Sequence, residues 1–105
     1  MTLEEKLESF KRDRVGFHVG SREVAELLGE TLGRIGIHGN AGSTAHDAVM
    51  LSWEDHAEDT WVSVNFPYVR GTFCDGSRSY SGNYLKEIYE VTVEELEEYL
   101  GKAGE

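Results

Sequence analysis

The chain has 105 residues, and its twenty Asp and Glu residues outnumber ten Lys and Arg residues, which gives a formal net charge of −10. That length is enough for one domain with a modest core, and a hydrophobic share of 39% with one proline argues against a disordered chain. The charge repels nucleic-acid backbones and anionic membranes, so we expect neither as a direct partner, and it favours basic protein surfaces.

The sequence has no pattern typical of a targeting signal or a membrane segment. The stretch MTLEEKLESFKRDR is charged throughout, unlike a signal peptide. No apolar run approaches the roughly 20 residues that span a bilayer. The single cysteine, Cys74, has no partner for an internal disulfide, which is typical of a reducing compartment. We therefore expect a cytoplasmic protein with no membrane partner, and no residue pattern here leads us to expect a cofactor.

Three helices are predicted. The first covers residues 1–13 and the last follows Thr92, and each begins with Thr and Glu three positions apart, the spacing of a capping box. Ser21 is placed to cap a central helix, in which apolar residues recur at helical spacing. Gly33 and Gly36 are the expected stop of the central helix, and Gly101 is the expected stop of the last one.

Gly29 is an unfavourable residue for its position. It lies inside the central helix, where glycine costs about 1 kcal/mol relative to alanine. A missing side chain permits a close approach of another element. We therefore expect tight packing of this helix on the sheet at Gly29.

Strands are predicted where apolar and polar residues alternate, over residues 14–20, 60–66, 68–74 and 80–91. Asp75-Gly76 predicts a tight turn. The polar stretch 37–47 predicts a loop. Residues 48–53 fit either one or two helical turns or a buried extended segment, and both readings stay open.

Together these elements predict an α+β single domain. Its small, mostly antiparallel sheet of about four strands is flanked by an N-terminal, a central and a C-terminal helix. The N-terminal helix is assigned to 1–13, the α+β body to 14–100 and a tail to 101–105.

The stretch WEDHAED, residues 53–59, is unusually acidic. Residues 46–59 hold five carboxylates and no Lys or Arg: Asp47, Glu54, Asp55, Glu58 and Asp59. A short charge run is most often a solvated face, and we favour one that meets a partner. Two alternatives stay open, a metal site that uses His46 and His56 with these carboxylates, and an acid–base pair. The spacing matches no zinc motif.

A second acidic set lies near the C-terminus, with six glutamates and no base between residues 87 and 98. Glu94 and Glu98 are like charges at i and i+4 of the last helix, which costs a few tenths of a kcal/mol. With Glu95 they form the second candidate partner-binding face. Solubility is the alternative explanation of their charge.

No catalytic motif is present, so we expect a non-enzymatic protein. Cys74 lacks the electropositive surroundings that activate a thiol. The stretch GIHGNAGS has neither the GxGxxG nor the P-loop pattern. A protein that sequesters a signalling nucleotide is the alternative, and it would draw on the few arginines that could bind an anion, Arg14, Arg22, Arg70 and Arg78.

Several phrases of the sequence carry a resemblance: VGFHV, SREVAELLGETLGRIGI, EDTWVSVN, GTFCDGSRSY and YEVTVEEL. In this order they resemble small uncharacterised proteins of phages and prophages, over residues 14 to 98. The chain departs from them by its additional N-terminal helix and by Gly39-Asn40, where such proteins often carry a tryptophan. These motifs are structural, so the resemblance transfers no active-site residue.

The resemblance implies a context of counter-defence, in which small acidic proteins include anti-CRISPR inhibitors. Some of these present carboxylates where the phosphates of a nucleic acid would lie. A Cas nuclease holds its duplex in a positively charged channel, so an acidic protein has a suitable target there. We expect an inhibitor that binds a Cas effector, or another defence protein, through an acidic surface and blocks nucleic-acid binding or cleavage.

Overall fold

The computed structural model describes residues 1–13, 15–38, 44–64, 73–77 and 86–103. In chain order their elements are α1 (Leu3–Arg12), β1 (Val15–Val19), α2 (Arg22–Arg34), α3 (Ala45–His56), the 3-10 helix η2 (Ala57–Asp59), β2 (Thr60–Val64), β3 (Phe73–Ser77), β4 (Glu87–Tyr89) and α4 (Val93–Ala103). The predicted α+β class is confirmed. None of the helices in these ranges has the length and apolar character needed to cross a membrane.

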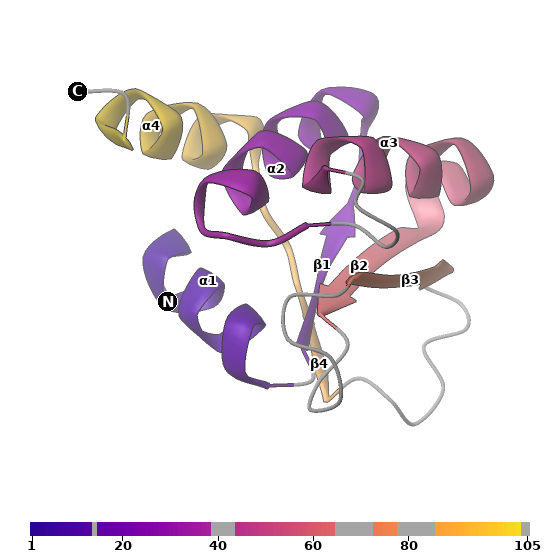
Figure 1. Cartoon of the computed structure of the whole chain (residues 1–105), viewed down its shortest axis with the longest axis horizontal. Coiled ribbons are helices and arrows are strands. Elements are labelled where there is room, and N and C mark those ends of the chain that lie inside the picture. Colours follow the sequence, from indigo (N-terminus) through magenta and orange to yellow (C-terminus); the bar gives the residue numbers. More distant parts are fainter. Residues whose placement is uncertain (14, 39–43, 65–72, 78–85, 104–105) are drawn as a thin grey trace.

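The described strands form one sheet in the order β3-β2-β1-β4 (Figure 1). β1 pairs antiparallel with β2, and β2 pairs antiparallel with β3. β4 lies parallel to β1, with Phe17 opposite Tyr89. A parallel neighbour needs a crossover connection rather than a hairpin. The described sheet is therefore mixed, with two antiparallel pairs and one parallel pair.

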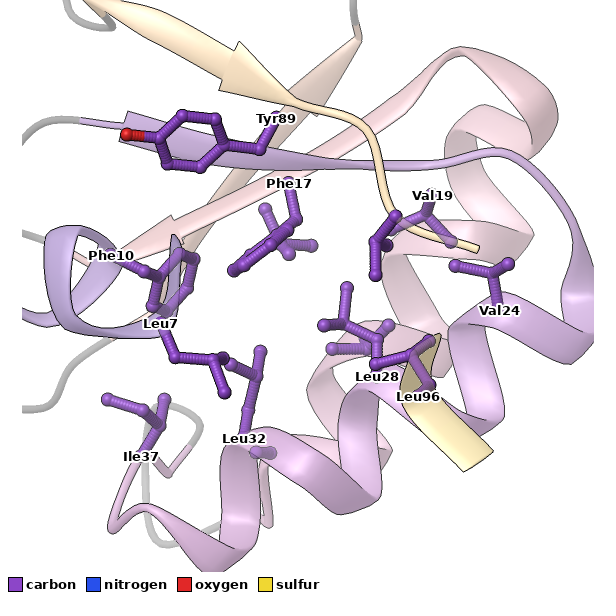
Figure 2. Close-up of a cluster of buried hydrophobic side chains, with 14 of the residues drawn as sticks. Leu7, Phe10, Phe17, Val19, Val24, Leu28, Leu32, Ile37, Tyr89 and Leu96 are labelled. Atoms are coloured by element: carbon purple, nitrogen blue, oxygen red, sulfur yellow. The ribbon is translucent and has the colours of Figure 1, made fainter. Parts of the chain in front are cut away.

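One hydrophobic core joins the sheet to the four described α-helices. Phe17 of β1 is fully buried, and its ring centroid lies 5.1 Å from that of Phe10 in α1 and 6.0 Å from that of Tyr89 in β4. Figure 2 shows Leu28 of α2 and Leu96 of α4 directed toward the same region. Full burial of such a side chain contributes about 1.5–3 kcal/mol. This shared core fixes the helices relative to the sheet.

The end of α2 shows how Gly36 stops a helix. Gly36 has φ +91, a conformation that glycine adopts without steric cost. Its N–H donates to the carbonyl of Gly33 at 3.2 Å, and the Ile37 N–H donates to that of Leu32 at 3.0 Å. These two bonds form a Schellman motif, and Leu32 and Ile37 supply its usual apolar partners in the core (Figure 2). The predicted stop at Gly36 is confirmed, whereas Gly33, also expected to stop the helix, lies inside α2.

The close approach at Gly29 occurs against a helix. A Cβ atom at Gly29 would lie 2.6 Å from the Cα atom of His46, the second residue of α3. α2 and α3 run side by side (Figure 1). The prediction of tight packing at Gly29 is therefore confirmed. The prediction that the sheet is the packing partner is wrong, because the partner is α3.

Two local predictions are wrong. Asp75 and Gly76, expected in a turn, lie inside β3 and pair with Val62 and Trp61. Residues 65–72, which include most of the strand expected at 68–74, lie outside the described ranges. α4 continues through Gly101 to Ala103. Tertiary pairing and helix packing override the local preference of a single glycine in both places.

The open question about residues 48–53 is resolved in favour of a helix. α3 begins earlier than expected, because the Thr44 side chain accepts a hydrogen bond of 3.0 Å from the Asp47 N–H and so caps the helix. Residues 44–47, expected in a loop, are thus its cap and first turn. The strand expected at 80–91 is seen at Glu87–Tyr89, and residues 80–85 lie outside the described ranges.

Candidate functional site

The exposed side of α3 gathers the acidic residues of this helix. Ala45, Val49 and Ser52 are buried. Residues three, four or seven positions apart share a helix face. Asp47, Leu51, Glu54 and Asp55 have this spacing and are exposed on the side opposite Val49. We call these four residues the α3 acidic face.

A large apolar side chain lies at the centre of the α3 acidic face. Leu51 is 60% exposed, with Asp47 one turn before it and Glu54 and Asp55 one turn after it. Single exposed leucines are common on protein surfaces. This one gives the face a mixed character, apolar in the middle and anionic at both ends.

No positive side chain offsets this charge along the nearby chain. Residues 35–69 contain no Lys or Arg. Glu54 and Asp55 also lie in the last turns of α3, where the helix dipole disfavours negative charge by about 0.3–1 kcal/mol. Glu54 and Asp55 therefore lower the stability of α3 slightly, and no nearby Lys or Arg in the sequence compensates for this.

The stretch WEDHAED divides where α3 ends. Ala57 has φ 51 and ψ −133, so the chain turns sharply there into η2. The hydroxyl of fully buried Thr60 lies 2.6 Å from the Ala57 carbonyl oxygen, which it can donate to. Glu58 is exposed and Asp59 half-buried in η2, so they continue the acidic surface beyond the helix rather than along the same helix face.

Replacing Ala57 with glycine is expected to stabilise the protein. A positive φ at a residue with a Cβ atom costs on the order of 1–3 kcal/mol, and glycine removes that cost while losing up to about 1 kcal/mol through its larger unfolded-state entropy. Urea denaturation should give a higher free energy of unfolding for Ala57→Gly. The matched control, Ala48→Gly inside α3, should lose about 1 kcal/mol. An equal loss in both variants would contradict the strained turn.

In the second predicted face, on α4, one of the three glutamates stabilises the fold. Glu95 forms the predicted capping box: its carboxylate accepts from the Thr92 N–H at 3.1 Å, and its own N–H donates to the Thr92 hydroxyl. Lys6 of α1 also lies 3.4 Å from this carboxylate. Burial acts to raise the pKa of Glu95, but the bonds from Thr92 and the charge of Lys6 outweigh it and lower the pKa. Glu95 therefore fastens α4 to α1.

Glu94 and Glu98 are exposed on α4, as expected. The two acidic sets lie on separate helices, and α2 lies between these helices, α3 and α4 (Figure 1). A pocket of about 270 Å³ lies where α4 meets the start of α1. Its lining mixes carboxylates with apolar surface: Thr2, Leu3, Glu4, Glu95, Glu98 and Tyr99. This recess suits a cation with an apolar stem better than it suits an anion.

The alternative sites receive little support in the described part of the chain. No group of three or more His, Cys, Asp or Glu side chains there is arranged to hold a metal ion, so His46 and His56 are not joined into one. Cys74 lies in β3 opposite Ser63. Arg22 is exposed and 3.9 Å from Glu26. The other three arginines of the predicted anion site lie outside the described ranges.

Sequence reasoning missed two features of this region, Leu51 and Ala57, and it did not identify the hydrogen-bond partners of His18. A helix assignment for residues 45–56 would have placed Leu51 on the opposite side of the helix from the buried residues Ala45, Val49 and Ser52. The positive φ of Ala57 has no signal in the sequence, because alanine rarely adopts it. His18 contacts residues far away along the chain, and no local pattern encodes such a contact.

Neither a protein-family model, nor a curated protein, nor a solved structure matches the chain.

Proposed function

We propose that the chain is a non-enzymatic binding protein that presents the α3 acidic face to a basic protein surface. The observation that supports this best is the arrangement of Asp47, Glu54 and Asp55 around the exposed Leu51. Two of these carboxylates oppose the helix dipole. This unfavourable placement of charge is followed by the strained turn at Ala57. Local features that reduce stability in this way are typical of surfaces that serve binding.

The physical consequences of such a face are specific. Unbalanced negative charge speeds the encounter with a basic surface and makes the association sensitive to salt. The centre of a protein interface is usually more apolar than its rim. Leu51 would fill that central position, and the surrounding carboxylates would pair with Lys and Arg side chains at the rim.

The partner that we propose most concretely is a Cas effector, which would make the chain an anti-CRISPR protein of a phage or prophage. A Cas effector holds nucleic acid in a positively charged channel. Carboxylates spaced along a rigid helix can occupy positions where phosphates would bind. The chain would then compete with the nucleic acid while having no affinity for nucleic acid itself.

A competition assay tests this partner. A Cas effector loaded with guide RNA is mixed with a fluorescent target duplex, and the chain is titrated into the mixture. We expect the duplex to be displaced, and the inhibition to weaken as the salt concentration rises. Undiminished duplex binding at saturating concentrations of the chain would remove the Cas effector from consideration.

Leu51→Ser is expected to weaken binding without loss of stability. The side chain is 60% exposed, so the free energy of unfolding should change by no more than about 0.5 kcal/mol. Loss of an apolar contact at the interface centre should lower the affinity about tenfold, or about 1.4 kcal/mol. Leu51→Met keeps the apolar bulk and should bind like the wild type. Equal binding by all three proteins would exclude Leu51 from the interface.

A further inference from the structure

His18 joins three parts of the fold. It lies in β1 on the side of the sheet opposite Phe17, and its side chain is 14% exposed. Its Nδ1 atom is 2.7 Å from the Oε2 atom of Glu90, and its Nε2 atom is 2.7 Å from the carbonyl oxygen of Glu58. One ring thus connects β1 to η2 and to the segment between β4 and α4.

Both atoms that face the ring are hydrogen-bond acceptors. A peptide carbonyl cannot donate, and an ionised carboxylate cannot donate either. A neutral imidazole has a single N–H, so it would donate to one oxygen and direct a lone pair at the other. The doubly protonated imidazolium donates to both. The geometry therefore fits the ring with two protons.

The carboxylate that the ring contacts favours the same state, and Lys6 of α1, which donates to the carbonyl oxygen of Glu90 at 2.9 Å, is a positive group at this segment that acts in the opposite sense. The titratable side chains on the two segments that His18 joins are all carboxylates, Glu58 and Asp59 in η2 and Glu90 before α4. On the neighbouring strands, β2 places Trp61 opposite His18. Tyr89 of β4 packs on Phe17 in the core, on the other side of the sheet.

We propose that His18 is a proton-operated clamp on the acidic turn formed by η2. With two protons the ring holds the Glu58 backbone to β1 and to Glu90, and when it loses one proton it gives up one of these bonds. The clamp therefore has both bonds while the ring carries two protons, and it keeps one of them after the ring loses a proton. Its use in regulating partner binding rests on the proposed function, because η2 extends the acidic surface beyond α3.

The clamp is tested on the chain alone by ¹⁵N NMR of the histidine ring. Spectra are recorded at about pH 5 and about pH 9, on either side of the ordinary histidine pKa of about 6.5. We expect both ring nitrogens of His18 to carry protons at the lower pH, and the backbone amide signals of Glu58 and Asp59 to shift in step with the ring. A lone pair on either nitrogen at the lower pH would overturn the proposal, as would amide signals that do not follow the ring.

Two variants separate the clamp from general structural damage. His18→Gln cannot titrate, so the pH-dependent shift of the Glu58 and Asp59 amides should disappear. His46→Gln, which alters an exposed histidine of α3, should leave that shift unchanged. If His18→Gln does not fold, Glu90→Gln retains the histidine and an acceptor but not the negative charge, and it should move the shift to lower pH. A shift that persists in His18→Gln, or that Glu90→Gln leaves in place, refutes the clamp.

These measurements involve no partner, so the two proposals fail separately. A ring that does not control the turn refutes the clamp, whatever the chain binds. The absence of a basic partner refutes the proposed function, whatever the ring does.

Discussion

Gly29→Ala is expected to lower the free energy of unfolding by about 1–3 kcal/mol, the range for inserting a methyl group into a packed interior. The added Cβ atom would lie 2.6 Å from the Cα atom of His46. That atom belongs to the backbone of α3, so no side-chain rotation can relieve the contact and the whole helix must move. Alanine gains about 1 kcal/mol over glycine in helix propensity, and we expect the clash to outweigh that gain.

Thermal unfolding measures this effect, because each 1 kcal/mol shifts Tm by about 4–8 °C in a domain of this size. The matched control is Gly33→Ala, in the same helix but exposed and with no atom within 4 Å of the added Cβ. It should raise the stability by up to about 1 kcal/mol. Two variants that change Tm in the same direction and by the same amount would contradict the close crossing of α2 and α3.

The double variant Glu54→Lys with Asp55→Lys is expected to move stability and binding in opposite directions. Both positions lie in the last turns of α3, where the helix dipole favours positive charge. The free energy of unfolding should therefore stay constant or rise by a few tenths of a kcal/mol. Like charges brought together at an interface cost several kcal/mol. The affinity for a basic partner should thus fall at least about 100-fold.

A second double variant separates local from global charge. Glu26→Lys with Glu30→Lys changes the net charge by the same amount on exposed positions of α2, and it gives up only surface ion pairs worth less than about 1 kcal/mol each. Its affinity should fall far less than that of the α3 variant, through the weaker long-range attraction alone. Calorimetric titration at two salt concentrations distinguishes the two effects. Equal losses in both variants would show that the partner senses the total charge and not α3.

The helix caps and the core stripes were predictable because they depend on residues close together in the sequence. The bonds of Thr2 with Glu5, and of Thr92 with Glu95, follow from a spacing of three. Phe10 and Phe17 are apolar residues at regular helical and strand spacing, and both are buried. In each case local chemistry and the tertiary fold favour the same conformation.

The features that could not be predicted depend on contacts between distant residues. The alternation of apolar and polar residues does not state whether β4 runs parallel or antiparallel to β1. Asp75-Gly76 has the composition of a turn, but pairing with β2 holds it extended. The need for glycine at position 29 was visible, whereas its partner was not, because α3 itself was undecided between a helix and an extended segment.

The candidate site was predictable in composition but not in shape. The sequence identified the acidic residues of 46–59, and only the helix assignment places Asp47, Glu54 and Asp55 on one side with Leu51 among them. In the other acidic set, Glu95 bonds to Lys6, which is distant in sequence. The number of glutamates in this set is therefore larger than the number of carboxylates available to bind a partner.

Affinity capture tests the central claim, that α3 binds a basic protein, most directly. The wild-type chain and its two double variants are immobilised, exposed to nuclease-treated lysate of a host that expresses a CRISPR effector, and eluted in a salt gradient. We predict a stoichiometric, basic, nucleic-acid-binding protein that salt releases from the wild type and from the α2 variant and that the α3 variant does not retain. The same protein held equally by the α3 variant, or no protein held by the wild type, would contradict the claim.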